Sequence, residues 1–443
     1  MSKLGTSIRS KVRQGSLFNA EVIDIGVGVA SVRLGPRGAV YSNLKVVGGP
    51  VVVGQVVRID FSTNPPQIVA IGAPTYEPGV MVPSIRTISR VGVSGEPIGP
   101  QPVYWNPIPT RSWVWTKLRP YGDTPKYWRT VSASHDGMVI AVNSINSIDL
   151  MISYNGGSTW TTTDPTMHGG YTDIDKVVVS FDGTFIAVAE YGSNQAYESG
   201  FIYTSDDAGE TWTKRTPCGS TVKAWQIIDC SDDGSFIISG QALNWSGRLW
   251  MSSNSGVDWT ETRPVGNFSR NWSAVACDSD GSHLIAGCCD GTSANSRLYI
   301  STDSGANWTE TQPVGNNGRV WSGVAINSDG TVLMAVDSSD GFWISTDSGS
   351  NWSQITATDY DLHLGVECDA SGQQMVVIAE STIDFVHSLF TSEDEGDTWN
   401  KEQPALQENG SWEPICFAGD GNCIVVGSRY YGDHNGFLYI GRR

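Results

Sequence analysis

The sequence lacks several features that mark membrane, redox or metal-dependent proteins. Its 443 residues include only 8 Cys and 6 His, and no two cysteines stand at C-x-x-C spacing. This pattern supports no zinc site, and we expect free, buried thiols, no metal and no cofactor. No apolar run approaches the length of a membrane span, and residues 1–16 lack the apolar core of a secretory signal. We therefore expect neither a signal peptide nor a membrane anchor.

Basic residues are also scarce relative to acidic ones. Lys and Arg number 28 against 46 Asp and Glu, which gives a net charge of −18. The first 73 residues nevertheless carry eight basic and three acidic residues, a balance of +5, so the remainder carries −23. This basic segment has only Phe18, Tyr41 and Phe61 as aromatic residues, too few to favour a single-strand nucleic-acid surface. We expect no nucleic-acid partner.

Glycine, by contrast, is abundant, with 50 residues, and much of it belongs to a repeated octet. The octet Ser301–Trp308 follows the pattern S-x-[DN]-x-G-x-x-W, in which Ser and Asp or Asn oxygens can accept bonds from turn amides. Glycine supplies the positive φ of the turn. The pattern recurs with its Asp or Asn at these positions: Asn155, Asp207, Asn254, Asp303, Asp347 and Asp394. Each octet is flanked by short β-rich runs, so it predicts a strand, a tight turn and a strand.

The octets start 52, 47, 49, 44 and 47 residues apart, the spacing of four-stranded propeller blades. A turn dipeptide, usually Asp-Gly, recurs in step with them, and it has seven copies from Asp136-Gly137 to Asp420-Gly421. The seventh blade ends at Arg443 before its outer strand. The segment Trp115–Pro120 matches Trp259–Pro264, the strand after an octet, and no complete blade precedes it. We therefore predict an all-β, seven-bladed β-propeller over residues 113–443, closed by this early strand.

The octets resemble Asp-boxes, or BNR repeats, which occur in sialidases, sortilin-type receptors, some plant-polysaccharide hydrolases and many bacteriophage and bacterial surface proteins. In these families the boxes have a structural role on turns opposite the usual ligand site. The resemblance implies the same for the six octets here. It does not imply one activity, because both enzymes and binding proteins carry these repeats.

Residues 17–73 differ in composition from the propeller and contain about five β-rich segments separated by Gly and Pro. They predict a small OB-like or SH3-like β-barrel, preceded by a basic arm over residues 1–16. A connector rich in Pro and Gly follows over residues 74–112. It packs against its own propeller or lies along a neighbouring subunit. The barrel resembles the small N-terminal modules of phage tail and baseplate proteins, which implies a docking domain.

In the predicted blades the Asp-Gly turns and the octets emerge on one face, which we call the turn face. The opposite face, here the loop face, carries the connections that vary most between repeats. Aromatic and basic side chains of these loops are the candidate ligand contacts: Tyr191, Tyr197, Trp245, Phe268, Arg270, Arg319, Tyr360, Arg429, Tyr430 and Tyr431. Aromatic faces stack on sugar rings, so a glycan ligand is indicated. Five recurrent tryptophans either join this surface or pack between blades: Trp128, Trp225, Trp272, Trp321 and Trp412.

The function predicted from these features is non-enzymatic. We expect a multi-copy or oligomeric virion protein of a bacteriophage tail, baseplate or capsid, assembled in the host cytoplasm. Its propeller would bind a host-surface glycan or receptor protein, and residues 1–112 would dock to other virion proteins. A glycoside hydrolase is the alternative, although the F/Y-R-I-P motif of sialidases is absent and their propellers have six blades. Catalytic carboxylates would come from a pool that includes Glu190, Asp337 and Glu380. A bacterial surface or filament-forming adhesion protein is a third interpretation.

Overall fold

The computed structural model divides the chain into two compact units, Met1–Thr110 and Arg111–Arg443. In the first unit it describes only backbone stretches, and in the second it describes residues 112–443 with gaps. The gaps are 146, 148, 167–172, 192–199, 220–222, 242–246, 290–295, 316, 338–340, 356–361, 381–386, 405–410 and 430–435, together with the side chains of 173, 362, 363, 411, 413 and 429. The arm 1–16 and nearly all of the connector 74–112 lie outside the described residues.

Five strands are described in the first unit: β1 (Phe18–Gly26), β2 (Val29–Arg33), β3 (Val40–Val47), β4 (Val56–Asp60) and β5 (Gln67–Val69). They pair as a closed barrel in the order β1-β2-β3-β5-β4, with β3 and β5 parallel. Closure of the ladder leaves no free sheet edge among these strands. The docking role of this segment stays a prediction.

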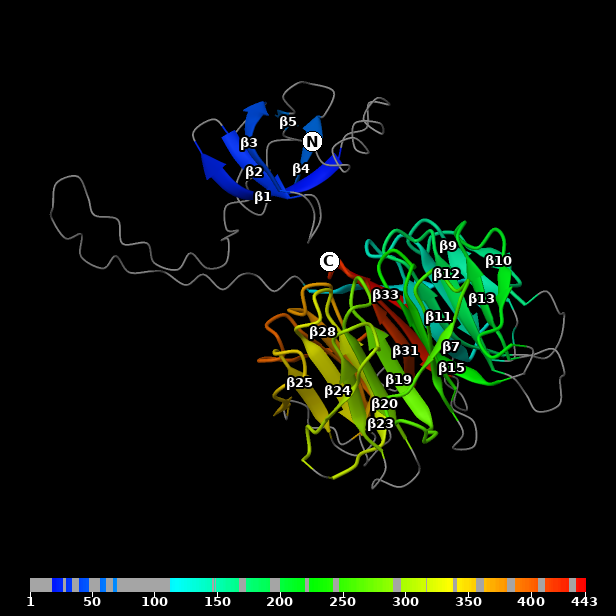
Figure 1. Cartoon of the computed structure of the whole chain (residues 1–443). Coiled ribbons are helices and arrows are strands. Elements are labelled where there is room, and N and C mark those ends of the chain that lie inside the picture. The colour runs from blue at the N-terminus through cyan, green and yellow to red at the C-terminus, as the bar shows by residue number, and fades with distance from the viewer. Residues whose placement is uncertain are drawn as a thin grey trace. The chain divides into compact units, whose positions relative to one another are not determined.

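The second unit is a β-propeller of seven four-stranded antiparallel sheets, drawn in Figure 1 around a common centre. The first strands of the blades contact one another and surround the central channel. They are β7 (Trp128–Ala133), β11 (Asp173–Val179), β15 (Trp225–Cys230), β19 (Trp272–Cys277), β23 (Trp321–Ile326), β27 (Leu362–Cys368) and β31 (Ser411–Phe417). The second strands are β8 (Ile140–Ser144), β12 (Ile186–Tyr191), β16 (Ile237–Gln241), β20 (Leu284–Cys288), β24 (Leu333–Asp337), β28 (Met375–Glu380) and β32 (Cys423–Arg429).

The third strands are β9 (Leu150–Ser153), β13 (Ile202–Ser205), β17 (Leu249–Ser252), β21 (Leu298–Ser301), β25 (Phe342–Ser345), β29 (His387–Ser392) and β33 (Leu438–Arg442). The outer strands are β10 (Thr161–Thr163), β14 (Thr213–Arg215), β18 (Thr260–Thr262), β22 (Thr309–Thr311), β26 (Ser353–Gln354), β30 (Asn400–Glu402) and β6 (Val114–Leu118). Blades 1 to 7 are numbered by their first strands, from β7 to β31. The described part of the chain contains strands and no helix that could cross a membrane.

Hydrophobic burial between neighbouring blades holds the propeller together. Every residue of β8, β16, β20 and β24 is buried, because these second strands are covered on both faces by adjacent sheets. The outer strands are mostly exposed and carry Thr, Lys and Glu. One cluster joins Ala141 and Ile152 of blade 1 to Val177 and Ile186 of blade 2, and similar clusters follow around the ring.

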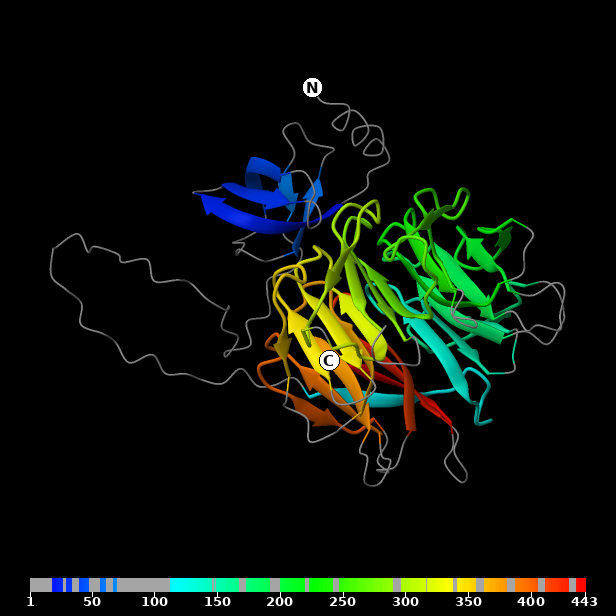
Figure 2. The same ribbon diagram turned by 60° about the horizontal axis from the view of Figure 1, so that its bottom comes forward.

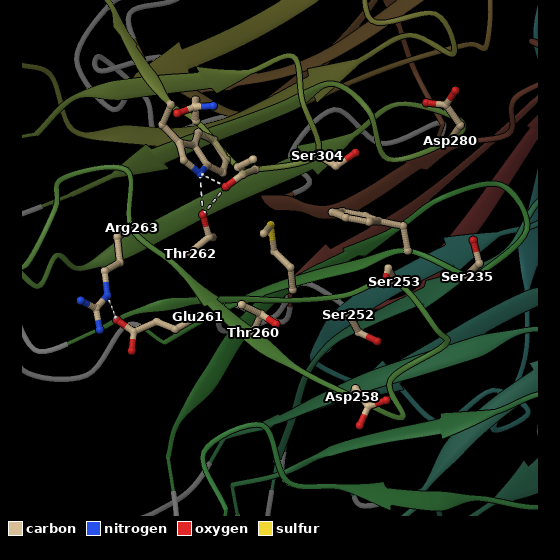
Figure 3. Close-up of a pocket in the computed structure, with 16 residues that line it drawn as sticks. Ser235, Ser252, Ser253, Asp258, Thr260, Glu261, Thr262, Arg263, Asp280 and Ser304 are labelled. Atoms are coloured by element: carbon tan, nitrogen blue, oxygen red, sulfur yellow. Dashed lines mark hydrogen bonds and ion pairs between the residues drawn. The ribbon is translucent and has the colours of Figure 1, made fainter.

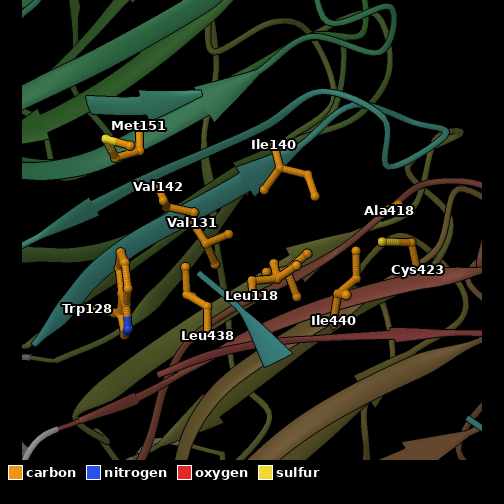
Figure 4. Close-up of a cluster of buried hydrophobic side chains, with 11 residues drawn as sticks. Leu118, Trp128, Val131, Ile140, Val142, Met151, Ala418, Cys423, Leu438 and Ile440 are labelled. Atoms are coloured by element: carbon orange, nitrogen blue, oxygen red, sulfur yellow. The ribbon is translucent and has the colours of Figure 1, made fainter. Parts of the chain in front are cut away.

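The ring is closed by β6, which pairs antiparallel with β33 as the outer strand of blade 7. In Figure 2 the cyan of β6 lies beside the red of β33. Leu118 is 5% exposed and packs in a cluster of side chains from blades 1 and 7, shown in Figure 4. The predicted borrowed strand and the seven blades are confirmed. Leu118 occupies the position that Thr262 has in blade 3, where Thr262 donates to the Gly305 carbonyl of blade 4. At the closure, apolar contact replaces this hydrogen bond.

Backbone hydrogen bonds on the turn face form a second closed ring. At the turn after each first strand, an amide donates to a carbonyl of the next blade, with N···O distances of 2.8–3.2 Å. The donors are His135, Phe181, Asp232, Ser279, Ser328, Ala370 and Asp420. The last of these returns to the carbonyl of His135, so one bond crosses each of the seven blade boundaries.

Truncation of the closing strand tests its contribution. We expect Leu118→Ala to lower the free energy of unfolding by about 2–4 kcal/mol, because it opens a cavity between blades 1 and 7. Val114→Ala is the matched control on the same strand, since Val114 is 67% exposed and should change stability little. Urea unfolding of both variants measures the difference. Equal free energies of unfolding of the two variants would contradict the conclusion that packing of β6 through Leu118 stabilises the propeller.

Candidate functional site

The described loops confirm how the two faces of the propeller are divided. In six blades the fourth residue of the octet donates its amide to the carbonyl beside the Asp-Gly turn of the same blade, at 2.8–3.0 Å. Ala208 bonds to Thr184 and Ser304 to Ser282 in this way. Octets and Asp-Gly turns therefore share the turn face. The loops between second and third strands and those between blades lie at the opposite ends of the strands, on the loop face.

The Ser and Asp or Asn oxygens of the octets form hydrogen bonds within the same turn. Ser301 Oγ donates to Asp303 at 2.9 Å and accepts the Gly305 amide at 2.9 Å, while Asp303 accepts the Asn307 amide at 2.8 Å. Hydrogen bonds from Asn307 hold the pKa of Asp303 below its usual value. Trp308 Nε1 donates to Thr262 Oγ1 of the preceding blade at 2.6 Å. The octet thus shapes its own turn and ties two blades together.

One feature of the octet differs from the sequence expectation. Positive φ was predicted at the glycine, but the residue before it also has positive φ: Ala208, Ser255, Ser304, Ser348 and Glu395 lie at 54–57°. Two successive left-handed residues turn the chain so that its amides face the serine. In blade 1 both positions are glycine, Gly156 and Gly157.

On the loop face, four blades begin with a basic residue two positions before the buried tryptophan of the first strand. The four are Lys126, Lys223, Arg270 and Arg319. Their amides donate to equivalent carbonyls of the preceding blade, on Gly436, Gly200, Gly247 and Ser296, at 2.9–3.3 Å. Arg270 and Arg319 were predicted from the sequence as ligand contacts, whereas the two lysines were not. The signal that identifies all four is the tripeptide [KR]-x-W at the blade start.

The two arginines of this set are held by neighbouring side chains. Arg319 Nε lies 4.0 Å from the buried carboxylate of Asp337. Arg270 bonds to Tyr299, whose pKa is raised to about 12 chiefly by burial, and Tyr299 packs edge-on against Trp272. Both arginines are half-buried. These contacts limit side-chain motion at the loop face, which lowers the entropy cost of binding an anion.

The remaining candidate contacts fall into two groups. Phe268 is 71% exposed in the loop before β19, and Tyr191 ends β12 half-buried. Arg429 ends β32, but its side chain is outside the described residues, as are Tyr197, Trp245, Tyr360, Tyr430 and Tyr431. The structure thus places Phe268, Arg270 and Arg319 on the loops before blades 4 and 5.

The recurrent tryptophans belong to the core. Trp128, Trp225, Trp272, Trp321 and Trp412 are all buried at the start of the first strands. Trp225 Nε1 donates to the Gly200 carbonyl at 3.1 Å, within the same boundary that Lys223 closes. Of the two interpretations, packing between blades is confirmed. A sugar cannot reach these rings without unfolding the blade starts.

The described carboxylates of the proposed catalytic pool serve the scaffold. Glu190 is fully buried and accepts the amides of Gly200 and Phe201 at 2.8 and 3.2 Å. Asp337 faces Arg319, and Glu380 lies 3.6 Å from His387 Nε2. Each is therefore bound to a different partner. All eight cysteines are free, and no group of three metal-ligating side chains occurs among the described residues.

A groove of about 870 Å³ lies on the other side of the molecule, between the octets of blades 3 and 4. Trp308 Nε1 donates to Thr262 Oγ1 in this groove at 2.6 Å. Figure 3 shows Thr262 there, with Arg263 beside Glu261. Met251 and Phe236 form apolar parts of the lining. The contact between Thr262 and Trp308 connects blades 3 and 4, whereas Arg263 and Glu261 both belong to blade 3. The groove shares no residue with the loop-face candidates.

Comparisons with known proteins agree with this architecture. The family model of the sortilin Vps10 domain (sortilin, neurotensin receptor 3) matches residues 296–414. The structure of YCF48 from Cyanidioschyzon merolae is similar with a TM-score of 0.52 and 15% identity, over 74% of this chain and 98% of that one. YCF48 bound to a D1 peptide gives 0.53 and 14%, over 75% and 97%. At such identity the likeness establishes the propeller fold.

A third solved structure is less similar, and the curated proteins contain no match. The xyloglucanase of family GH74 from Xanthomonas campestris has a TM-score of 0.40 and 18% identity, over 69% of this chain and 56% of that one.

Charged side chains also meet inside the propeller. Burial raises the pKa of Glu367, on β27, to about 7, with opposing effects from Lys176 on β11 and Asp229 on β15. These residues belong to blades 6, 2 and 3, so they face one another across the central channel. Asp229 accepts the Cys277 amide at 2.8 Å, and burial raises its pKa as well. The channel is polar here and favours a neutral Glu367.

Substitution of Glu367 tests the channel environment. A raised pKa means that the folded protein holds a proton that the unfolded chain releases, so Glu367 costs stability as pH rises from about 4.5 to about 7. Glu367→Gln should therefore gain stability over the wild type by a few kcal/mol above pH 7 and show little gain below pH 4.5. Urea unfolding at both pH values measures this. An equal gain in the free energy of unfolding at both pH values would contradict the burial of Glu367 that raises its pKa.

Proposed function

We propose that this chain is a non-enzymatic binding protein of a bacteriophage virion, whose loop face recognises an anionic glycan or protein on the host surface. The observation that carries the proposal is the set of cations at equivalent blade starts: Lys126, Lys223, Arg270 and Arg319. They lie on the face with irregular loops, in a chain of net charge −18. An acidic ligand fits these cations and would be repelled by most other surfaces of the protein.

Two further points support binding over hydrolysis. The described carboxylates Glu190, Asp337 and Glu380 each have a partner in the scaffold, and no two of them are paired as acid and nucleophile. A propeller of similar fold, YCF48, has been solved with a bound D1 peptide. A propeller of this fold can therefore hold a peptide ligand.

The virion assignment rests on the first unit. Its barrel is basic while the rest of the chain is acidic, which suits docking and recognition by separate parts. In this proposal residues 1–112 bind other virion proteins, and several copies act together. Mass spectrometry of purified particles should detect the chain in stoichiometric amount. Its absence from particles that infect normally would remove the virion assignment.

The binding role is tested with an array of acidic and neutral glycans and host envelope proteins. We expect an acidic ligand to bind, and the double variant Arg270→Gln/Arg319→Gln to lower its affinity at least tenfold, because two charge-assisted hydrogen bonds are lost. Arg215→Gln on the outer strand β14 is the matched control and should bind normally. Equal affinity of the double variant would contradict the site. Sugar released from the ligand during incubation would establish the hydrolase instead.

A further inference from the structure

An exposed apolar patch lies on the turn face at blades 1 and 2. Among the described residues six large hydrophobic side chains are well exposed, and three of them meet here. They are Met138 (41% exposed), Tyr154 (44%) and Phe181 (40%). The ring of His135 stacks on Phe181 with centroids 3.9 Å apart. We call these four residues the turn-face patch.

Hydrogen bonds place the turn-face patch at the boundary between blades 1 and 2. The Met138 carbonyl accepts the Gly156 amide at 2.9 Å, which brings Met138 beside the octet that contains Tyr154. The Tyr154 hydroxyl reaches blade 2 and donates to the Ala208 carbonyl at 2.7 Å. The His135 amide donates to Phe181 at the same blade boundary. The patch therefore bridges two blades at their outer and inner ends.

The other blades carry small or polar residues at these positions. In the place of Met138 stand Thr184, Ser235, Ser282, Thr331, Gln373 and Asn422. In the place of Tyr154 stand Asp206, Ser253, Thr302, Thr346 and Glu393. His135 is the blade 1 equivalent of Phe181, and the remaining blades carry Asp232, Ser279, Ser328, Ala370 and Gly419 there. The fold therefore does not require apolar residues at these positions.

Met138 also lacks a hydrogen bond that an equivalent residue makes. Thr184 Oγ1 donates to Asp182 at 2.8 Å and so reinforces its own turn, whereas Met138 has only its amide on Asp136, at 3.0 Å. Exposure of large apolar groups at places where the other blades carry small or polar residues indicates a surface that is covered in a complex.

Acidic residues surround the turn-face patch. Burial, followed by the carboxylates of Glu210 and Asp207, raises the pKa of Tyr154. At the other end Asp420 and Asp136 act on His135 against the effect of burial. The carboxylates of Asp136 and Asp420 thus lie near His135 at one end of the patch, and those of Asp207 and Glu210 lie near Tyr154 at the other. Charge complementarity thus selects a basic partner with apolar side chains between its cations.

We infer that the turn-face patch docks a basic, apolar-bearing peptide segment of a partner protein. The partner's aliphatic side chains would cover Met138, Tyr154 and Phe181, and its Lys or Arg would lie against the surrounding carboxylates. This surface is on the opposite face from the proposed ligand site. Its test is therefore independent of the loop-face cations.

The test measures binding of a fluorescent peptide in which Lys and Leu alternate to the full-length protein. The variant Met138→Thr/Tyr154→Thr/Phe181→Ser carries residues that sister blades use, and it should bind at least tenfold more weakly. A peptide of alternating Lys and Ser should bind the wild type weakly and respond little to the variant. Arg270→Gln/Arg319→Gln should leave binding of the Lys-Leu peptide unchanged, whether or not the loop-face proposal holds.

A gain-of-binding variant guards against a folding defect. Thr331→Met/Thr346→Tyr/Ala370→Phe moves the three apolar residues to blades 5 and 6 and should add a second peptide site of similar affinity. Equal peptide affinity of the wild type and the Met138/Tyr154/Phe181 variant would overturn the proposal. The proposal would also be overturned if the wild type bound no peptide but formed a dimer that the Met138/Tyr154/Phe181 variant abolishes. A second copy of the chain would then be the partner.

Discussion

The ring of seven backbone hydrogen bonds on the turn face constrains everything else in the propeller. Each bond fixes the distance between two neighbouring blades at their inner ends. A change in one blade must therefore be accommodated by all seven. The octets add a second set of contacts further out, where Trp308 joins its blade to Thr262 of the one before. The connections that vary in length and sequence lie at the far ends of the strands, whereas the turn face varies only in single side chains such as Met138.

Closure by β6 completes this constraint. The seventh blade would otherwise end in an unpaired edge, next to a first blade with no covalent link to it. Leu118 joins the two through a shared hydrophobic cluster, and Arg442 donates to the Gly137 carbonyl of blade 1 at 2.9 Å. The chain thus seals its ring with a segment that comes directly from the connector.

Much of the fold can be predicted from sequence because the chain contains several copies of the same repeat, which can be compared with one another. Octet spacing, turn dipeptides and the orphan strand at Trp115 were sufficient to predict seven blades and their faces. The second positive φ, as at Ser304, was missed because serine carries no conformational signal of its own. Trp321 was ambiguous in sequence, since a repeated tryptophan serves core and ligand equally, and only its burial decided.

The sites were harder to predict than the scaffold. Arg270 and Arg319 were recognised as loop cations, while Lys126 and Lys223 became meaningful only when their amides proved to make the same bond. Glu190 was a plausible acid until its oxygens were seen to hold Gly200 and Phe201. Single positions such as Met138 gain significance when aligned with their sister blades. Local pattern specifies turns, whereas the neighbours of a side chain depend on how blades pack.

Amide hydrogen exchange at the seven ring donors tests the closed turn face most directly. If the ring is one cooperative unit, the amides of His135, Phe181, Asp232, Ser279, Ser328, Ala370 and Asp420 should exchange together, at the rate of global unfolding. Faster exchange of Asp420 alone, whose amide bonds to the His135 carbonyl, would mean that the ring opens between blades 7 and 1, and would contradict the account.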